Sequence, residues 1–217
     1  MADEVVLLDD YVSMFGMRAR VALAEKGVEY EYREESLQAE KSTLLLQMNP
    51  VHKQVPLLIH NGNPICESLI IVEYIDEVWK DKSPDLLPAD PYHRAQARFW
   101  ANFVDRKVYD AGRRLSGTKE EEQESGKKDF IAALKLLEAE LGDKPYFGGE
   151  NFGFLDVALI PFYTWFPASR LAATLALKRA LSENMGEEMR GESVSKSLAD
   201  PKKVYDFVLF LKKKYGR

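Results

Sequence analysis

The chain has 217 residues, a formal net charge of -5 at pH 7 and 46% hydrophobic residues. This length fits one large domain or two modest ones, and the apolar content excludes a chain that is disordered throughout. The acidic balance argues against a general nucleic-acid-binding protein, which needs a basic face. One cysteine, Cys66, excludes an internal disulfide and favours a reducing compartment. The sequence has no apolar stretch of the roughly 18 residues needed to span a bilayer and no secretory signal, so we expect a cytoplasmic protein without membrane or nucleic-acid partners.

The first 48 residues predict a strand, a helix, a second strand and a second helix in that order. Ser13 lies in the loop between the first strand and the first helix, which we place at residues 9–15. Gly27 is typical of the position just after a helix end, and Asn49-Pro50 ends the second helix. The expected elements are residues 5–8, 18–26, 29–33 and 42–48.

The most informative stretch is residues 49–68, NPVHKQVPLLIHNGNPICES. Its Val55-Pro56 step precedes a short apolar strand, and such a proline is often cis in a tight turn beside a site. Asn61-Gly62 is typical of a two-residue hairpin turn. Glu67-Ser68 precedes an apolar helix, whose N-terminal N–H groups suit an anionic ligand group. Together these features indicate a pocket for a peptide-like ligand with a carboxylate, although a plain hairpin followed by a helix would explain Asn61-Gly62 alone.

Strand signals disappear beyond a proline-rich stretch that begins near residue 80. Apolar residues then recur at four-residue spacing within residues 92–114 and 127–141, which predicts helices. A further helix is expected over residues 157–166, with the Asp156 carboxylate accepting a backbone N–H at its start, so we assign Asp156 a structural role. We therefore expect a first domain at residues 1–79, a linker at 80–90 and an all-helical domain at 91–217.

Three segments in this order, SMFGMRARVALAEKG, NPVHKQVP and ICESLIIVEYIDE, resemble cytosolic glutathione transferases, and the plant tau class in particular. The resemblance covers almost the whole chain. It implies an α/β, thioredoxin-like N-terminal domain of order βαβαββα followed by an all-α C-terminal domain. It also implies a homodimer, glutathione as co-substrate, and no permanently bound cofactor or metal.

The resemblance assigns a role to individual residues. Ser13 would polarise the glutathione thiol, Lys41 and Lys53 would bind the glycyl carboxylate, and Glu67 and Ser68 would bind the γ-glutamyl end. The implied glutathione-binding set is Ser13, Phe15, Lys41, Lys53, Gln54, Val55, Pro56, Glu67 and Ser68. The implied electrophile-binding set is Tyr11, Met14, Phe15, Leu37, Tyr109, Arg113, Trp165 and Phe210, with the alternative that Trp165 and Phe210 are core residues.

The chemistry expected of Ser13 follows from the acidity of a thiol. A free thiol has a pKa near about 8.5, and lowering it by about two units takes about 2.7 kcal/mol of preferential thiolate stabilisation. One hydrogen bond to a charged group contributes roughly 1.5–3 kcal/mol. A hydroxyl near a helix N-terminus can therefore supply most of it, while a plain loop or capping serine is the alternative role. A Ser-His-Asp hydrolase is a poor interpretation, because the three histidines fall in loops without a nucleophile elbow.

Two departures from the tau-class pattern are visible. Met14 stands where the class usually has proline, so the loop loses a rigid φ angle next to Ser13. Residues 168–191 do not resemble the class, and Met185 to Arg190 can be encoded so that another reading frame gives Trp-Ala-Lys-Arg-Cys. We hypothesise a locally frame-shifted segment from a recombined or engineered gene, with ordinary divergence as the alternative.

The leading functional hypothesis is conjugation of the glutathione thiolate to aryl halides, activated alkenes or herbicides, with reduction of organic hydroperoxides as a second activity. One alternative is a glutathione-dependent thiol oxidoreductase, but this needs a nucleophilic cysteine where the chain has Ser13. The other alternative is a non-catalytic carrier of hydrophobic ligands.

Overall fold

The computed structural model describes residues 4–82, 84–115, 120–165 and 192–215. Residues 168–191, for which we hypothesise a frame-shifted origin, lie outside the described residues. Within the described part of the chain, no helix is both long and apolar enough to cross a membrane.

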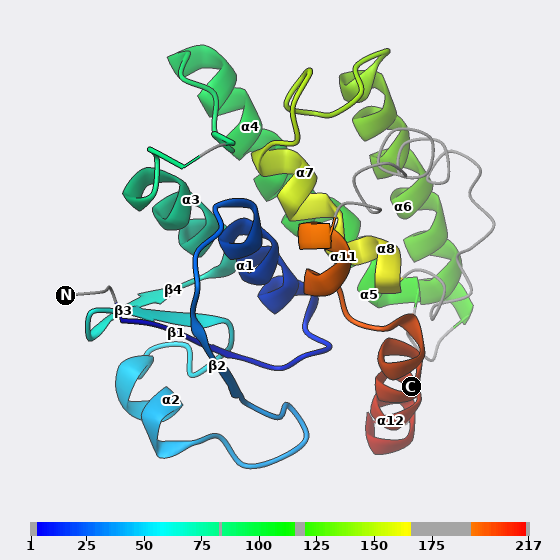
Figure 1. The fold of residues 1–217 in the computed structure, drawn as a ribbon. Coiled ribbons are helices and arrows are strands. Elements are labelled where there is room, and N and C mark those ends of the chain that lie inside the picture. Colours follow the sequence, from blue (N-terminus) through cyan, green and yellow to red (C-terminus); the bar gives the residue numbers. More distant parts are fainter. Residues whose placement is uncertain (1–3, 83, 116–119, 166–191, 216–217) are drawn as a thin grey trace.

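The N-terminal half is built around a four-stranded sheet with the order β2-β1-β3-β4 (Figure 1). β1 pairs in parallel with β2 and antiparallel with β3, and β3 pairs antiparallel with β4. Helices α1, α2 and α3 complete the βαβαββα order expected from the sequence. The bounds are β1 Val5–Asp9, α1 Met14–Glu25, β2 Glu31–Glu34, α2 Thr43–Met48, β3 Leu57–His60, β4 Asn63–Cys66 and α3 Ser68–Val78.

Helices cover both faces of this sheet. Val5 and Leu7 of β1 pack with the residues of α1 and α3, whereas Val6 and Leu8 pack with Leu45 of α2. Alternate residues of a strand point to opposite faces, so the continuous apolar run in β1 is what a strand buried on both sides requires. All five residues of β1 are buried.

Helix α1 begins at Met14, four residues before the start that the sequence predicted. The Ser13 Oγ accepts a hydrogen bond from the Gly16 N–H at 3.2 Å, which caps the first turn. Met14 and Phe15 therefore belong to the first turn of the helix and not to the loop.

The two turns predicted between residues 49 and 68 are confirmed. The Val55–Pro56 peptide bond is cis. Asn61 and Gly62 both have positive φ angles, 50° and 77°, as a tight two-residue hairpin turn requires.

The second half of the described chain is helical. Helix α6 begins at Glu120 and therefore includes the charged residues just before the expected start at residue 127. The helix expected over residues 157–166 is two helices, since Pro161 has no N–H to continue the first and starts the second. The bounds are α4 Pro91–Phe103, π-helix η1 Val104–Tyr109, α5 Asp110–Leu115, α6 Glu120–Leu141, α7 Phe154–Leu159, α8 Pro161–Trp165, α11 Glu192–Ser197 and α12 Pro201–Tyr215.

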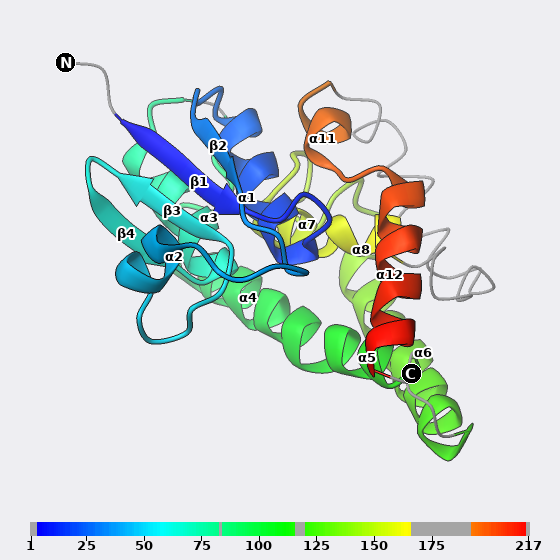
Figure 2. The ribbon, with the colours of Figure 1, turned by 90° about the horizontal axis from the view of Figure 1, so that it is seen from below.

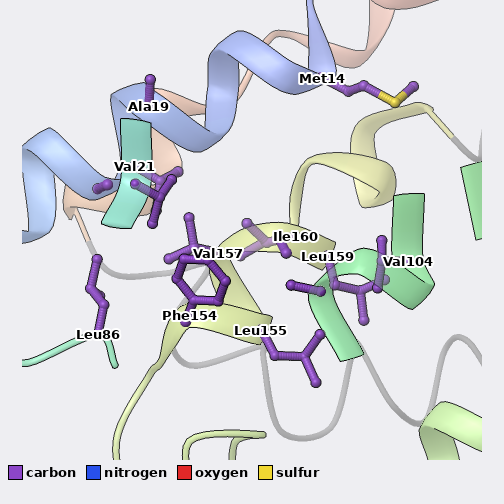
Figure 3. Packing of buried hydrophobic residues seen from close by; sticks show 14 of the residues in the cluster. Met14, Ala19, Val21, Leu86, Val104, Phe154, Leu155, Val157, Leu159 and Ile160 are labelled. Atoms are coloured by element: carbon purple, nitrogen blue, oxygen red, sulfur yellow. The ribbon is translucent and has the colours of Figure 1, made fainter. Parts of the chain in front are cut away.

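One continuous apolar core joins the two halves. Val21 of α1 lies on the side toward Phe154 and Val157 of α7 (Figure 3), and all three are buried. Helix α12 lies beside α8, near the N-terminal end of α1 (Figure 2). The first turn of α1, which Ser13 caps, is thus surrounded by elements from both halves.

The structure confirms Asp156 as a capping residue. Its carboxylate accepts the N–H groups of Gly153 at 2.9 Å, Gly148 at 3.1 Å and Phe147 at 3.0 Å. Gly153 has no hydroxyl, so this is half of a capping box, extended to the preceding loop. Burial raises the pKa of the Asp156 carboxyl to about 6, although the three N–H donors oppose that rise.

Candidate active site

One edge of the sheet gathers the segments that the sequence singled out. The register pairs Leu8 with Leu57 and Leu57 with Cys66, so the end of β1, the start of β3 and the end of β4 lie side by side. The Ser13 loop follows β1, the cis proline precedes β3, and Glu67 and Ser68 follow β4. Helices α1 and α3 both start at this edge, and their N-terminal N–H groups favour negative charge there.

Ser13 is a buried N-cap residue, with 6% of its surface exposed. Its Oγ accepts the Gly16 N–H, and a hydroxyl has one hydrogen to donate as well as lone pairs to accept. The bond to Gly16 therefore orients the oxygen and does not use the hydroxyl hydrogen. That hydrogen can be donated to an anion bound at the N-terminus of α1.

The loop that carries Ser13 is fixed by hydrogen bonds of its own Asp10 and of a side chain from the helical half. The Asp10 carboxylate accepts the N–H of Val12 at 3.0 Å and of Leu37 at 2.7 Å. The Ser13 N–H donates to the Asp10 carbonyl at 2.8 Å. On the other side, the Trp165 Nε1–H of α8 donates to the Val12 carbonyl at 3.0 Å.

A buried charge pair lies beneath the first turn of α1. The Asp9 carboxylate is completely buried and neither oxygen has a hydrogen-bond partner, while Arg20 Nη1 lies 3.6 Å from Oδ2. Burial raises the pKa of Asp9 well above its usual range, and the nearby Arg20 guanidinium opposes this. A Cβ on Gly16 would lie 1.6 Å from Asp9 Oδ1, so the helix can pack on this carboxylate only with glycine at position 16.

Sequence reasoning missed Arg18, whose side chain is completely buried and joins three elements. Its Nη1 donates to Ser68 Oγ at 3.1 Å, Nη2 to Asp105 Oδ1 at 2.6 Å, and Nε to the Ala158 carbonyl at 2.9 Å. Arg18 thus connects α1 to the start of α3, to η1 and to α7. The available signal was a charged residue in the apolar first helix, where burial demands a partner.

Asn49, read from the sequence only as a helix stop, shapes the turn before the cis proline. Its buried amide accepts the His52 N–H at 3.1 Å and donates to the Gln54 carbonyl at 2.9 Å. Lys53 in this turn is exposed and has a positive φ angle of 54°. His52 Nδ1 lies 3.3 Å from Glu67 Oε1, so the turn and the start of α3 are in contact.

Four of the expected electrophile-binding residues have rings that pack against other aromatic rings. Phe15 and Tyr109 pack edge to face with ring centroids 5.1 Å apart, and Phe210 stacks on Phe207 of α12. Trp165 packs edge to face on the same Phe207 at 6.0 Å. These rings bring α1, η1, α8 and α12 together around the first turn of α1.

The remaining expected site residues lie partly on the surface and partly in the core. Arg113 is exposed and pairs with Asp110, while Lys41, Gln54 and Leu37 are exposed on the surface. The Tyr11 ring is near two cations, with Arg20 5.0 Å and Lys203 4.6 Å from its centroid, and its hydroxyl accepts the Asp200 N–H just before α12. Met14 is buried in the core of α1, α3 and α7.

Comparisons with known proteins identify the family. The N-terminal domain family of glutathione S-transferases matches residues 4–77, and the C-terminal domain family matches residues 94–182. The chain is 60% identical to glutathione S-transferase U19 of Arabidopsis thaliana, over 99% of both chains. It is 59% identical to the probable glutathione S-transferase parC of Nicotiana tabacum, over 99% of this chain and 98% of the relative.

Solved structures agree with these sequence relatives. A rice glutathione S-transferase, OsGSTU1, in complex with glutathione has a TM-score of 0.90 and 47% identity, over the full length of both chains. A tau-class glutathione S-transferase from mango, Mangifera indica, has a TM-score of 0.88 and 39% identity, over 96% of this chain and 98% of that one. The chain therefore belongs to the tau class of the glutathione S-transferase family, and it is an enzyme that conjugates glutathione.

Proposed function

We propose that this enzyme joins the glutathione thiolate to hydrophobic electrophiles, and that the Ser13 hydroxyl stabilises the thiolate. The observation that carries the proposal is the position of Ser13, buried at the N-terminus of α1 with its oxygen oriented by Gly16. A hydrogen bond to a charged group contributes roughly 1.5–3 kcal/mol and a helix N-terminus about 0.3–1 kcal/mol. Together these supply the roughly 2.7 kcal/mol that lowers a thiol pKa by about two units.

Glutathione would then lie along the edge of the sheet. The backbone of Val55, before the cis Pro56, faces an extended peptide as an edge strand does. Ser68 at the start of α3 takes the γ-glutamyl carboxylate, and Glu67 takes the γ-glutamyl amine. Lys41 and Lys53 bind the glycyl carboxylate from the exposed side, and Gln54 and Phe15 complete the set.

We propose that the second substrate binds against the rings gathered around the first turn of α1. Phe15, Tyr109, Trp165 and Phe210 offer an apolar surface there, which suits aryl halides, activated alkenes and herbicides. The proposed electrophile-binding set remains Tyr11, Met14, Phe15, Leu37, Tyr109, Arg113, Trp165 and Phe210. The same thiolate can attack an organic hydroperoxide, and a second glutathione then completes reduction to the alcohol, water and glutathione disulfide.

Two alternatives are less well supported by the site. A thiol oxidoreductase needs an acidic cysteine thiol, but burial and the neighbouring Glu67 raise the pKa of Cys66, and Ser13 occupies the first loop. A carrier of hydrophobic ligands would bind them without turnover. Glutathione-affinity retention together with turnover of halonitrobenzene, isothiocyanate or cumene hydroperoxide separates an enzyme from a carrier.

We further propose a cytoplasmic homodimer with a glutathione-binding domain at residues 1–79, a linker at 80–90 and an electrophile-binding domain at 91–217. Ile70 of α3 and Tyr92 and Phe99 of α4 are large apolar side chains that are 56%, 68% and 57% exposed. Glu73 of α3 pairs with Arg98 of α4, so these exposed residues belong to neighbouring helices. Light scattering at micromolar concentration tests the dimer, and a monomer mass would refute it.

Ser13→Ala tests the proposed chemistry. The loss of one hydrogen bond to a charge, worth roughly 2 kcal/mol, should lower the turnover number about thirtyfold and raise the pKa of bound glutathione, with little change in glutathione affinity. Ser42 is the matched control because it caps α2 in the same way, its Oγ accepting the Leu45 N–H at 3.0 Å. Ser42→Ala should reduce stability by about 1 kcal/mol without this loss of turnover. An unchanged turnover number in Ser13→Ala would remove the assignment.

A further inference from the structure

The peptide unit that precedes Ser13 is held from two sides. The Ser13 N–H donates to the Asp10 carbonyl at 2.8 Å, and the Val12 carbonyl accepts the Trp165 Nε1–H at 3.0 Å. Asp10 belongs to the same loop, whereas Trp165 is the last residue of α8 in the other half of the chain. The indole bond is therefore the contact that ties this peptide unit to the helical half.

Trp165 is itself well fixed. It is half-buried, it packs against two apolar clusters, and its ring meets Phe207 of α12 edge to face at 6.0 Å. Helices α8 and α12 are neighbours (Figure 2), so the indole is supported by α12. A donor held in this way can fix the orientation of the carbonyl that it contacts.

The orientation of this carbonyl bears directly on Ser13. Rotation about the Cα–C bond of Val12 moves this carbonyl and the Ser13 Cα atom together, and the hydroxyl moves with them. Displacements of about 1 Å in a reacting group can cost on the order of a hundredfold in rate. Met14 follows Ser13, so no proline restricts the backbone at that position and the loop depends on its hydrogen bonds.

We propose that Trp165 is a positioning residue for Ser13, acting through the Nε1–H···O=C bond to Val12. This role is separate from the contact with the electrophile that the family resemblance implies. It rests on the proposed function, because it assumes that Ser13 stabilises the thiolate. In this role the indole N–H matters for turnover, whereas in a simple pocket wall only the shape of the ring matters.

The test replaces Trp165 by 3-benzothienylalanine, in which sulfur takes the place of the N–H and the ring keeps its shape. Trp165→Phe is a second variant that needs no unnatural residue. We expect the turnover number to fall about two- to tenfold, the range for loss of one neutral hydrogen bond, and the pKa of bound glutathione to rise. The KM for a chloronitrobenzene should stay within about twofold in the benzothienyl variant.

Two controls separate this role from general effects. Trp100→Phe changes a tryptophan of α4 that packs on Phe99 and Phe103, and it should leave the pKa of bound glutathione unchanged. Phe207→Leu removes the ring beside Trp165 and leaves the N–H in place. It should raise the thiol pKa less than the benzothienyl variant does, because the donor is still present.

Each outcome decides the inference. A benzothienyl variant that changes only the acceptor KM would make Trp165 a pocket wall and overturn the proposal, and so would a variant with unchanged kinetics and thiol pKa. Urea unfolding of each variant checks that it is folded. If Ser13→Ala also leaves the thiol pKa unchanged, the proposed role of Ser13 fails. If Ser13→Ala raises the thiol pKa and the benzothienyl variant does not, only the role of Trp165 fails.

Discussion

Replacement of Arg18 by methionine should be among the most damaging single changes in this chain. The variant retains much of the apolar stem but removes all three hydrogen bonds of the guanidinium, to Ser68, Asp105 and Ala158. The Ala158 carbonyl and the Ser68 hydroxyl are buried and lose this donor, at about 1–3 kcal/mol for each group left unsatisfied. Asp105 is 30% exposed, so water can solvate its carboxylate and its loss of a partner adds less.

These terms agree with the roughly 3–5 kcal/mol lost when one partner of a buried ion pair is removed. A typical domain has about 5–15 kcal/mol of stability in total, so the unfolding midpoint in urea should fall markedly. Glutathione affinity, measured by fluorescence titration, should weaken about five- to tenfold because the Ser68 hydroxyl loses the donor that orients it. Arg18→Lys keeps the charge but cannot reach all three partners. Its unfolding midpoint should lie between those of Arg18→Met and the unmodified protein.

Arg33→Met is the matched control. Arg33 is an exposed arginine that pairs with Glu31 on its own strand, and exposed pairs contribute little to stability. Its unfolding midpoint should match that of the unmodified protein. If Arg18→Met unfolds at the same urea concentration as Arg33→Met, the buried arginine does not hold α1, α3 and η1 together and the reasoning is wrong.

Two further predictions concern packing and pH. Gly16→Ala would place a Cβ 1.6 Å from the buried Asp9 carboxylate, so it should cost about 3 kcal/mol or more in urea unfolding; Gly112→Ala, whose Cβ meets Phe130 at 3.7 Å, should be neutral or stabilising. The pKa of Asp156 is raised to about 6 in the folded state, so its contribution to stability is complete below about pH 4 and is lost as the pH rises through 6. The unfolding free energy of Asp156→Asn should therefore improve relative to the unmodified protein by about 2–3 kcal/mol between pH 4 and pH 7.5, and a difference that does not change with pH would contradict this account.

Much of the fold could be predicted from local pattern. The βαβαββα order, the Asn61-Gly62 hairpin turn, the cis Val55–Pro56 bond and the capping role of Asp156 all follow from short-range rules about turns, caps and periodicity. Helix boundaries were less accurate. The start of α1 moved to Met14 because Ser13 caps it, and Pro161 divided the expected helix into α7 and α8.

The site was predictable only in part. Ser13, Pro56 and Ser68 could be predicted from the sequence because each lies at the end of a local element, where turn and capping residues follow known patterns. The sequence by itself also determined the class of fold and the tau-class family, since these depend on the order and type of the motifs.

Only the tertiary structure decided which side chains support that site. Arg18 and Ser68 are 50 residues apart in sequence, and Trp165 and Val12 are 153 apart, yet each pair is joined by a hydrogen bond. Asp9 and Gly16 are in contact because α1 folds back over the end of β1. Such contacts form only when elements that are distant in sequence pack together. Local sequence patterns do not predict them, because a buried polar side chain needs a hydrogen-bond partner and that partner lies elsewhere in the chain.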